Sequence, residues 1–368
     1  MVLFTTETIK ATRRTKMKKR IYSLLLAGAL GLTLLAGCGS KEETTEATTA
    51  VTEATTEAAT TEPEEATSSD SAKNSTEAED RAGNTIMIPD NVERIISMAP
   101  STTQFLIDLG VADKIIAIDT NSAVYADQLP ADVQQFDMMA PDNEALVALE
   151  PDIIFTSGMS NVGGDDVYQP AKAAGVCVAD IPSSTSFDDI VEDLKFIGMA
   201  VHEDAKADEL INVFLAQLDD LKKIGDTISE KKTVLFEISL PSEEYPSVYT
   251  FGKGTYLDEM ITMIGAENVT GDQESWISIS EEEAIAMNPD VIITNVNYID
   301  DAAGVIKSSP GWENVTAVKN GDVYYIDADS SNQPNNHVID AMVQMAKYIY
   351  PDAYKDFADP FATAGDAE

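Results

Sequence analysis

Three features of this sequence could do chemistry: a reactive serine or cysteine, a phosphate-binding loop, and a pair of glutamates. Ser160 lies in GMSNVGG, which is not the G-x-S-x-G turn of serine hydrolases. The stretch FGKGTY (251–256) lacks the G-x-x-x-x-G-K-[ST] spacing of a phosphate loop. Cys177 lies in AGVCVADIP, where we expect a strand and a small apolar core residue. An enzyme needs a nucleophile, an acid–base pair or a cofactor loop, so we expect no enzyme, no catalytic residue and no cofactor.

The two histidines of the chain, His202 and His337, are too few for a metal site built on three histidines. His202 follows one expected helix and His337 precedes the last one, so we expect them to lie far apart. Each is expected to serve structure or to face solvent. We therefore predict no metal site.

A repeated unit carries the two glutamates. It reads EALVALEPDIIFTS at 144–157 and EEAIAMNPDVIITN at 282–295, each a glutamate opening a short apolar helix, then Pro-Asp, then an apolar strand. Proline ends the helix because it lacks the backbone donor. A carboxylate at a helix N-terminus is favoured by the helix dipole, which alone explains Glu144 and Glu282 structurally. Because the unit occurs once in each half, a paired role at the tips of a two-lobed body is the alternative that we favour.

The elements that must position these residues are strands alternating with helices. Short apolar strands such as KKTVLFEISL and PDVIITN are separated by helical patterns of about ten residues, which predicts an α/β fold with parallel sheets covered on both faces. Leu210, Phe214, Leu218 and Leu221 form one stripe of a much longer helix. We predict two α/β lobes at residues 81–203 and 230–358, a single rigid connecting helix at 204–229, a ligand cleft between the lobes, and a tail at 359–368.

The N-terminal part of the chain has the pattern of a signal peptide followed by a flexible tether. Residues 17–38, MKKRIYSLLLAGALGLTLLAGC, combine a basic start with a short apolar run and end in Leu-Ala-Gly-Cys. That ending resembles the lipobox of bacterial lipoproteins and implies lipidation of Cys38; an ordinary signal peptide or a membrane helix is the alternative. We predict an upstream extension plus signal peptide at residues 1–37. Residues 38–80 are rich in Thr and Glu and poor in large apolar residues, which predicts a disordered acidic tether.

The charge of the chain excludes one class of partner. The formal net charge is −40. Nucleic acid binding needs clustered Lys and Arg that release counterions from phosphates, so we expect no nucleic acid partner.

The order of these segments resembles the substrate-binding lipoproteins of ABC importers, in the group that binds vitamin B12, ferric siderophores and haem. The resemblance rests on ERIISMAPSTTQFLIDLG, EALVALEPDIIFT, a long helix, SWISISEEEAIAMNPDVIIT and a helix ending YIYPDAY. It implies a monomer whose two lobes hold a ligand between them. It also implies that Glu144 and Glu282 dock into arginine pockets of a permease dimer powered by a cytoplasmic ATPase.

Candidate ligand-binding residues come from two arguments. Ligands of open α/β sheets bind beyond the carboxyl ends of the strands, which indicates the loops that carry Ser101, Tyr125, Tyr245, Trp276, Asp329 and Gln333. The resemblance implies ligand contacts for Tyr125, Trp276 and the stretch 329–333. Aromatic faces suit a large flat ligand, although Tyr125 and Trp276 could also be ordinary partly buried aromatic residues.

The charge of the ligand follows from the scarcity of arginine. After the signal peptide the chain holds only Arg81 and Arg94, and the position where B12-binding relatives carry an arginine is Gln333. Arginine offers the fixed fork that anionic ligands require, whereas SSNQPNN (330–336) offers amide groups. Among ferric siderophores, corrinoids and haem, we therefore favour a neutral or weakly charged ligand such as a corrinoid or a hydroxamate siderophore.

These features together predict an extracytoplasmic protein, lipid-anchored to the cell membrane, that captures such a ligand and delivers it to a permease. The alternative is a lipid-anchored surface hydrolase or adhesin. Tight, saturable binding of a small ligand that is not chemically changed would distinguish an importer binding protein from a hydrolase or an adhesin.

Overall fold

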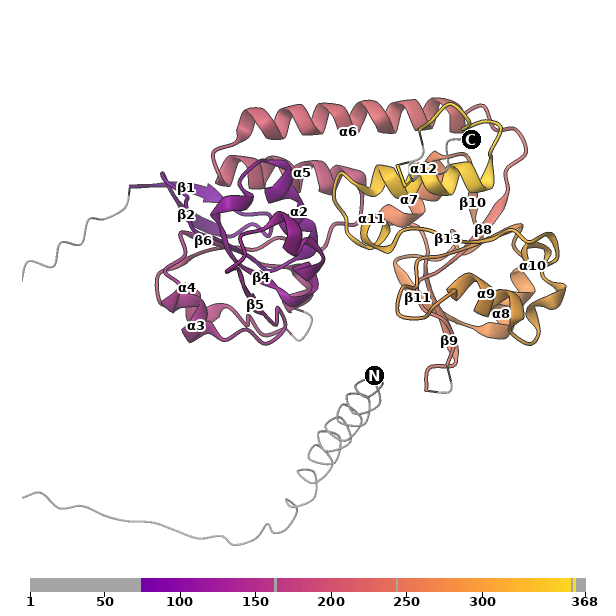
Figure 1. The fold of residues 1–368 in the computed structure, drawn as a ribbon, viewed down its shortest axis with the longest axis horizontal. Coiled ribbons are helices and arrows are strands. Elements are labelled where there is room, and N and C mark those ends of the chain that lie inside the picture. The colour runs from indigo at the N-terminus through magenta and orange to yellow at the C-terminus, as the bar shows by residue number, and fades with distance from the viewer. Residues whose placement is uncertain (1–73, 162–163, 243, 359, 362–368) are drawn as a thin grey trace, which may run out of the picture. The chain divides into compact units, whose positions relative to one another are not determined.

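The computed structural model describes residues 74–161, 164–242, 244–358 and 360–361 (Figure 1). The predicted signal peptide, Cys38 and most of the predicted tether lie outside the described residues, as does most of the predicted tail. The described part forms two α/β lobes, each built on its own parallel sheet, as the sequence predicts.

The N-terminal lobe holds a five-stranded sheet in the order β5-β4-β3-β6-β7, in which every pair is parallel. Its strands are β3 (Ile95–Ser97), β4 (Ile115–Asp119), β5 (Gln134–Phe136), β6 (Ile153–Phe155) and β7 (Cys177–Ala179). Its helices are α2 (Pro100–Asp108), η1 (Ala112–Lys114), η2 (Thr120–Gln128), α3 (Asn143–Ala148), η3 (Gly158–Asn161), α4 (Gln169–Ala173) and α5 (Phe187–Ala200).

The C-terminal lobe holds a four-stranded parallel sheet in the order β10-β8-β12-β13. Its strands are β8 (Thr233–Glu237), β10 (Glu267–Asn268), β12 (Val291–Thr294) and β13 (Val323–Tyr325). Its helices are α7 (Tyr256–Met263), α8 (Glu281–Met287), α9 (Ala302–Ser308), η4 (Trp312–Asn314), α10 (Thr316–Asn320), α11 (Ala328–Asn332) and α12 (Val338–Ile349).

Two antiparallel pairs accompany these sheets. In the C-terminal lobe β9 (Ser247–Phe251) pairs with β11 (Trp276–Ser280), so Trp276 lies in a strand, whereas the sequence predicted a loop. In the N-terminal lobe β1 (Ser75–Glu79) pairs with β2 (Thr85–Pro89). The predicted tether boundary at residue 80 is therefore wrong, because the ladder with β2 gives STEAE backbone partners that its polar composition did not indicate.

The helix α6 (Asp204–Gly225) connects the lobes along one side (Figure 1). It contacts α5 of the N-terminal lobe and both α7 and α12 of the C-terminal lobe. Its buried residues recur every three or four positions and form a single stripe that includes three of the four predicted residues, while the predicted Leu210 is only partly buried; the stripe consists of Ala207, Ile211, Phe214, Leu218, Leu221 and Gly225. One hydrophobic cluster includes this stripe and residues of both lobes. The stripe therefore fixes α6 to each lobe.

The helix ends at Gly225, before the predicted boundary at residue 229. A Cβ atom at Gly225 would lie 2.1 Å from the carbonyl oxygen of Met263, so only glycine allows this approach to the end of α7. The chain then turns, and the backbone N–H of Ile228 donates to the carbonyl oxygen of Gly225 at 3.1 Å.

Each central strand is buried on both faces. In β6, Ile153 and Phe155 belong to the cluster shared with α6, while Ile154 belongs to a separate cluster on the other face. The central strands of the C-terminal lobe alternate in the same way between the shared cluster and a cluster of their own. The apolar runs noted in the sequence thus reflect sheets that are covered on both sides.

Within the described part of the chain, each helix is too short or too polar to cross a membrane.

Candidate functional site

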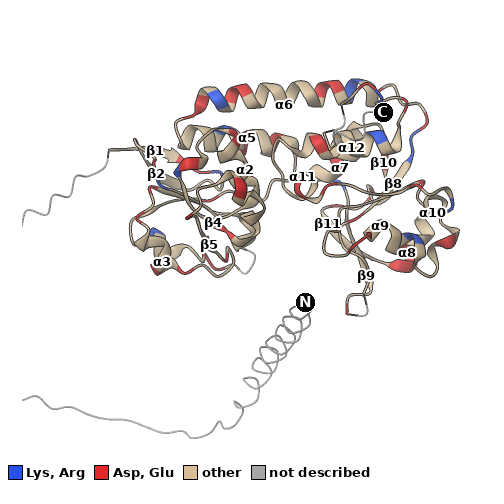
Figure 2. Ribbon diagram, in the orientation of Figure 1, with Lys and Arg blue, Asp and Glu red and all other residues tan. Residues whose placement is uncertain are grey.

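Glu144 and Glu282 occupy the same position in their helices. In α3 the N-cap is Asp142, whose Oδ1 accepts from Ala145 N at 3.1 Å, and Glu144 is the second residue after it. In α8 the N-cap is Ser280, whose Oγ accepts from Glu283 N at 3.1 Å, and Glu282 is again the second residue after the cap. Both carboxylates are exposed. In each lobe the helix lies on the side away from α6 (Figure 1 and Figure 2).

The Pro-Asp that follows each helix has a structural role in both lobes. Asp152 Oδ2 accepts from the backbone N–H groups of Glu93 and Arg94, each at 2.9 Å, directly before β3. Asp290 Oδ2 accepts from the N–H and the hydroxyl of Thr233, each at 2.9 Å, where β8 begins. The aspartate therefore ties each helix–strand turn to the neighbouring central strand. The hydrogen bonds of the two aspartates give the repeated Pro-Asp a structural role. The exposed glutamates take no part in these bonds, so the bonds do not explain why a glutamate occurs in both copies.

The predicted ligand loop joins the two lobes. Gln333 follows α11, and its Oε1 accepts a hydrogen bond from the hydroxyl of Tyr125 on η2 of the N-terminal lobe. Four residues further on, His337 Nε2 lies 2.9 Å from Asp108 Oδ2 at the end of α2. Asn336 Nδ2 donates to the same oxygen at 2.9 Å. The segment 333–337 thus supplies contacts from the C-terminal lobe to α2 and η2.

The pair formed by Asp108 and His337 is charged. Burial alone would raise the pKa of Asp108, but hydrogen bonds from His337 and Asn336 outweigh it and hold that pKa below its ordinary value. Hydrogen bonds to Asp108 and then to Asp340 raise the pKa of His337 to about 10. His337 therefore carries a proton at neutral pH and forms an ion pair across the lobes, while its imidazole remains 40% exposed. The sequence predicted a structural or solvent-facing histidine and did not identify this partner.

A buried polar network at the ends of β3 and β4 supports the helix η2, which carries Tyr125. The hydroxyl of Thr103 contacts Ser97 at 2.8 Å and Ser122 at 3.0 Å, and Ser122 donates to Asp119. Asp119 also caps η2 through the N–H of Asn121. This network fixes the start of η2 and with it the direction of Tyr125.

The environment of Tyr125 is apolar and negatively charged. The residue is 8% exposed, and burial, followed by the negative charge of Asp329, raises the pKa of its hydroxyl. Asp329 keeps much of its surface exposed, but partial desolvation of its carboxylate and then the negative charge of Asp327 raise its pKa. Tyr125, Asp329 and Gln333, which are far apart in the sequence, therefore lie in one neighbourhood.

Trp276 belongs to an aromatic group in the C-terminal lobe. Its ring stacks with Tyr249 at a centroid distance of 6.3 Å and meets Tyr256 edge-on at 6.4 Å. The hydroxyl of Tyr256 donates to the carbonyl oxygen of Ser331 at 2.9 Å, which links this group to α11. Trp276 remains 40% exposed, so part of its ring is available for a ligand.

Two predicted ligand residues lie elsewhere. In the ladder Trp276 pairs with Phe251, while Ser247 pairs with Ser280 at the other end, about 13 Å away at ~3.3 Å per residue. Tyr245 precedes Ser247 and is 68% exposed, so it lies beyond the end of the ladder opposite to Trp276. Ser101 lies in the first turn of α2, partly buried. No described contact joins either residue to the group around Tyr125.

Sequence reasoning missed several polar residues that support this region. Asn295 Nδ2 donates to Ser331 Oγ at 3.0 Å and to Asn332 Oδ1 at 2.7 Å, which fixes α11. Asp108 was not among the predicted site residues. A sequence pattern could not have found these residues, because their partners lie more than thirty positions away in the chain. Within the described residues, His, Cys, Asp and Glu side chains nowhere gather in a group of three that could hold a metal ion.

Comparison with known proteins gives one family and several relatives. The family described as periplasmic binding protein matches residues 95–330. An ABC transporter substrate-binding lipoprotein of Bacillus subtilis, YvrC, which is termed uncharacterized, is 29% identical over 92% of this chain and 100% of its own. A cobalamin-binding protein of Halobacterium salinarum is 24% identical over 74% of this chain and 73% of its own. The crystal structure of a possible iron-binding, periplasmic solute-binding protein of Staphylococcus epidermidis is 28% identical, with a TM-score of 0.62, over 71% of this chain and 100% of that one.

Proposed function

The chain belongs to the periplasmic binding protein family, and on that premise we propose that it is the substrate-binding protein of an ABC importer. In this proposal the two lobes hold a small ligand between them and deliver it to a membrane permease. The family and its relatives support a binding role, as does the lack of a motif for catalysis in the sequence.

The observation that carries the proposal is the equivalence of Glu144 and Glu282. Both lie two residues after an N-cap, both are exposed, and each is on the side of its lobe away from α6. Two carboxylates presented in the same way by two lobes suit a partner with two equivalent basic pockets, such as a permease dimer. Asp152 and Asp290 account for the rest of the repeated unit by hydrogen bonds, and no comparable internal contact accounts for the glutamates among the described residues.

The location of the protein follows from its N-terminal sequence. Leu35, Ala36 and Gly37 before Cys38 support a lipidated cysteine, and YvrC of B. subtilis is named a lipoprotein. We infer an extracytoplasmic protein anchored to the cell membrane through Cys38 and extended by an acidic tether.

We infer a neutral or weakly charged ligand, with a corrinoid or a ferric hydroxamate siderophore as the leading classes. Tyr125, Trp276, Asp329 and Gln333 supply aromatic surface, amide groups and one carboxylate, but no positive charge for an anion. The cobalamin-binding relative from H. salinarum supports the corrinoid class.

Uptake in cells is the experiment that tests this proposal. Cells that lack the chain should lose uptake of one labelled chelate, and expression of the intact chain should restore it. Cys38→Ser should reduce restoration, because the binding protein is no longer held at the membrane. Uptake of every tested chelate at the original rate in cells without the chain would contradict the proposal.

A further inference from the structure

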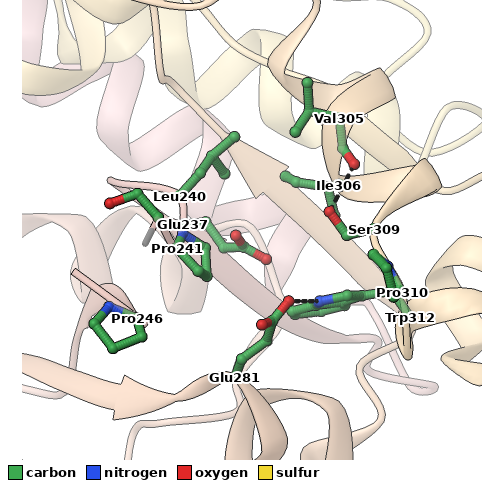
Figure 3. Close-up of a pocket in the computed structure, with 11 residues that line it drawn as sticks. Glu237, Leu240, Pro241, Pro246, Glu281, Val305, Ile306, Ser309, Pro310 and Trp312 are labelled. Atoms are coloured by element: carbon green, nitrogen blue, oxygen red, sulfur yellow. Dashed lines mark hydrogen bonds between the residues drawn. The ribbon is translucent and has the colours of Figure 1, made fainter. Parts of the chain in front are cut away.

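A cavity of about 350 Å³ lies in the C-terminal lobe, away from the residues that join the lobes (Figure 3). It is bounded by the end of β8, the loop that leads to β9, the first turn of α8, and the end of α9 with the turn after it. Tyr125, Trp276 and Gln333 do not line it. The cavity is therefore separate from the proposed ligand site.

A buried carboxylate with no partner points into this cavity. Glu237, the last residue of β8, is 1% exposed. Neither of its carboxylate oxygens forms a hydrogen bond with any described part of the chain. Figure 3 shows its side chain directed between the loop after β8 and the segment after α9. A buried carboxyl group whose oxygens lack hydrogen-bond partners is costly whether or not it carries a charge, so its retention here indicates a partner from outside the chain.

A second carboxylate lines the same cavity. Glu281 begins α8, and its Oε1 accepts from the indole Nε1 of Trp312 at 2.7 Å (Figure 3). That bond engages one oxygen and orients the side chain. Burial and then the negative charge of Glu281 raise the pKa of Glu237 to about 8. Once Glu237 is ionised, the two carboxylates repel each other, and a positive charge between them would relieve that repulsion.

The remaining walls define the kind of cation. They combine polar and apolar surface: the polar side chains are Ser242 and Ser309, and the apolar ones are Leu240, Pro241, Pro246, Val305, Ile306, Pro310 and the ring of Trp312. Lys and Arg are absent from the described residues that line the cavity. A hydrated metal ion needs more oxygen ligands than two carboxylates supply, and the described residues hold no group of three metal-ligating side chains. An alkylammonium ion matches both features, because its charge can meet the carboxylates while its methylene groups contact the apolar walls.

We propose that this cavity binds a small organic cation bearing an ammonium group, with Glu237 and Glu281 as its counter-charges. This second site is independent of the chelate proposed above. Glu281 directly precedes Glu282 in α8, so a bound cation changes the charge beside the proposed docking residue. Failure of chelate binding or of uptake would not bear on this site, and failure of amine binding would not bear on the proposed function.

The test is calorimetric titration of the full chain, purified in detergent, with butylammonium chloride. The matched probe 1-butanol has the same alkyl chain without the charge, while potassium chloride and calcium chloride supply charge without an alkyl chain. The variants are Glu237→Gln and Glu281→Gln in the cavity, and Glu283→Gln as the control. Glu283 is an exposed glutamate of the same first turn of α8 that does not line the cavity.

We expect one butylammonium ion to bind per chain, and 1-butanol and the inorganic cations to bind at least about tenfold more weakly. Glu237→Gln should weaken binding by about tenfold or more, the size of one charge-assisted contact, whereas Glu283→Gln should leave affinity unchanged. Because the pKa of Glu237 is raised and its ionised form is the counter-charge, binding at pH 7 should release a proton, measured from the dependence of the heat on the buffer's ionisation enthalpy. Glu281→Gln should still bind butylammonium, but more weakly than the unchanged chain does.

Several results would overturn the proposal. The first is that butylammonium shows no saturable binding. The others are that 1-butanol binds as tightly as butylammonium, that calcium binds more tightly than butylammonium, or that Glu237→Gln binds butylammonium with unchanged affinity. Thermal melting of each variant shows whether it is folded. If Glu237→Gln does not fold, proton release by the intact chain decides, since binding without proton release would exclude Glu237 as the counter-charge.

Discussion

His337 Nε2 lies 2.9 Å from Asp108 Oδ2, so the residue before the last helix is paired with the end of the first helix of the other lobe. The pair joins segments that are more than two hundred residues apart in the chain. Together with the bond from Tyr125 to Gln333, it makes the segment 333–337 one of the contacts between the lobes. A second contact is the hydrogen bond from the backbone N–H of Phe187 in α5 to Glu259 Oε2 in α7, at 2.7 Å.

His337→Gln should remove a pH-dependent part of the stability. The folded-state pKa of His337 is raised to about 10, so its contribution is complete below the unfolded pKa of about 6.5 and is lost as the pH rises to about 10. Because the imidazole is 40% exposed, solvent screens the pair and we expect a contribution of about 1 kcal/mol. Urea unfolding at pH 6 and pH 10 measures it. The difference between the two proteins should be large at pH 6 and small at pH 10, and an equal difference at both would show that the histidine acts by packing alone.

Glu144→Ala combined with Glu282→Ala should abolish uptake and leave ligand affinity within about twofold. The carboxylates are exposed and lie outside the group around Tyr125. Their loss should therefore remove only their contacts with the permease. Transport of labelled chelate and calorimetry of binding check the two halves of this prediction. Glu283→Ala removes the neighbouring charge and is the control. A large loss of affinity in the double variant would contradict the docking role.

Gln333→Arg should change the charge preference of the ligand site. Arginine would place a positive fork beside Tyr125, so anionic catecholate complexes should gain about tenfold in affinity, about the size of one charge-assisted hydrogen bond. The neutral ligand should lose affinity or stay unchanged. Competition binding with neutral and anionic chelates measures the ratio. An unchanged ratio would show that position 333 does not face the ligand.

Asp152→Ala and Asp290→Ala should each destabilise the fold by about 2 kcal/mol. Each removes a carboxylate that accepts two hydrogen bonds at the start of a central strand and leaves at least one backbone donor unpaired. Denaturant unfolding measures the loss. Asp132→Ala, at an exposed position, should change stability by less than about 0.5 kcal/mol. Equal effects at all three positions would contradict the structural role of the repeated Pro-Asp.

Local patterns predicted most of the fold. The apolar runs, the Pro-Asp turns and the stripe Phe214, Leu218, Leu221 indicated two parallel-sheet lobes and a long helix, because periodicity and proline act within a few residues. The antiparallel pair that carries Trp276 and the strand Ser75–Glu79 were missed, because each depends on a partner strand rather than on its own composition. The site was predicted less completely. Tyr125 and Gln333 were named as separate ligand residues, but their mutual bond and the pair of Asp108 with His337 depend on tertiary contacts.

The most direct test of the account is a thermal shift of the full chain and of Trp276→Ala against cobalamin, cobinamide, haem, and ferric hydroxamate and catecholate siderophores. A ligand that binds only the folded state raises the melting temperature by mass action. We predict that one neutral class, a corrinoid or a hydroxamate complex, raises the melting temperature of the intact chain and does so less in Trp276→Ala. A shift with only the anionic complexes, or an equal shift in the variant, would contradict the proposed site, and no shift with any compound would contradict a chelate or corrinoid as the ligand.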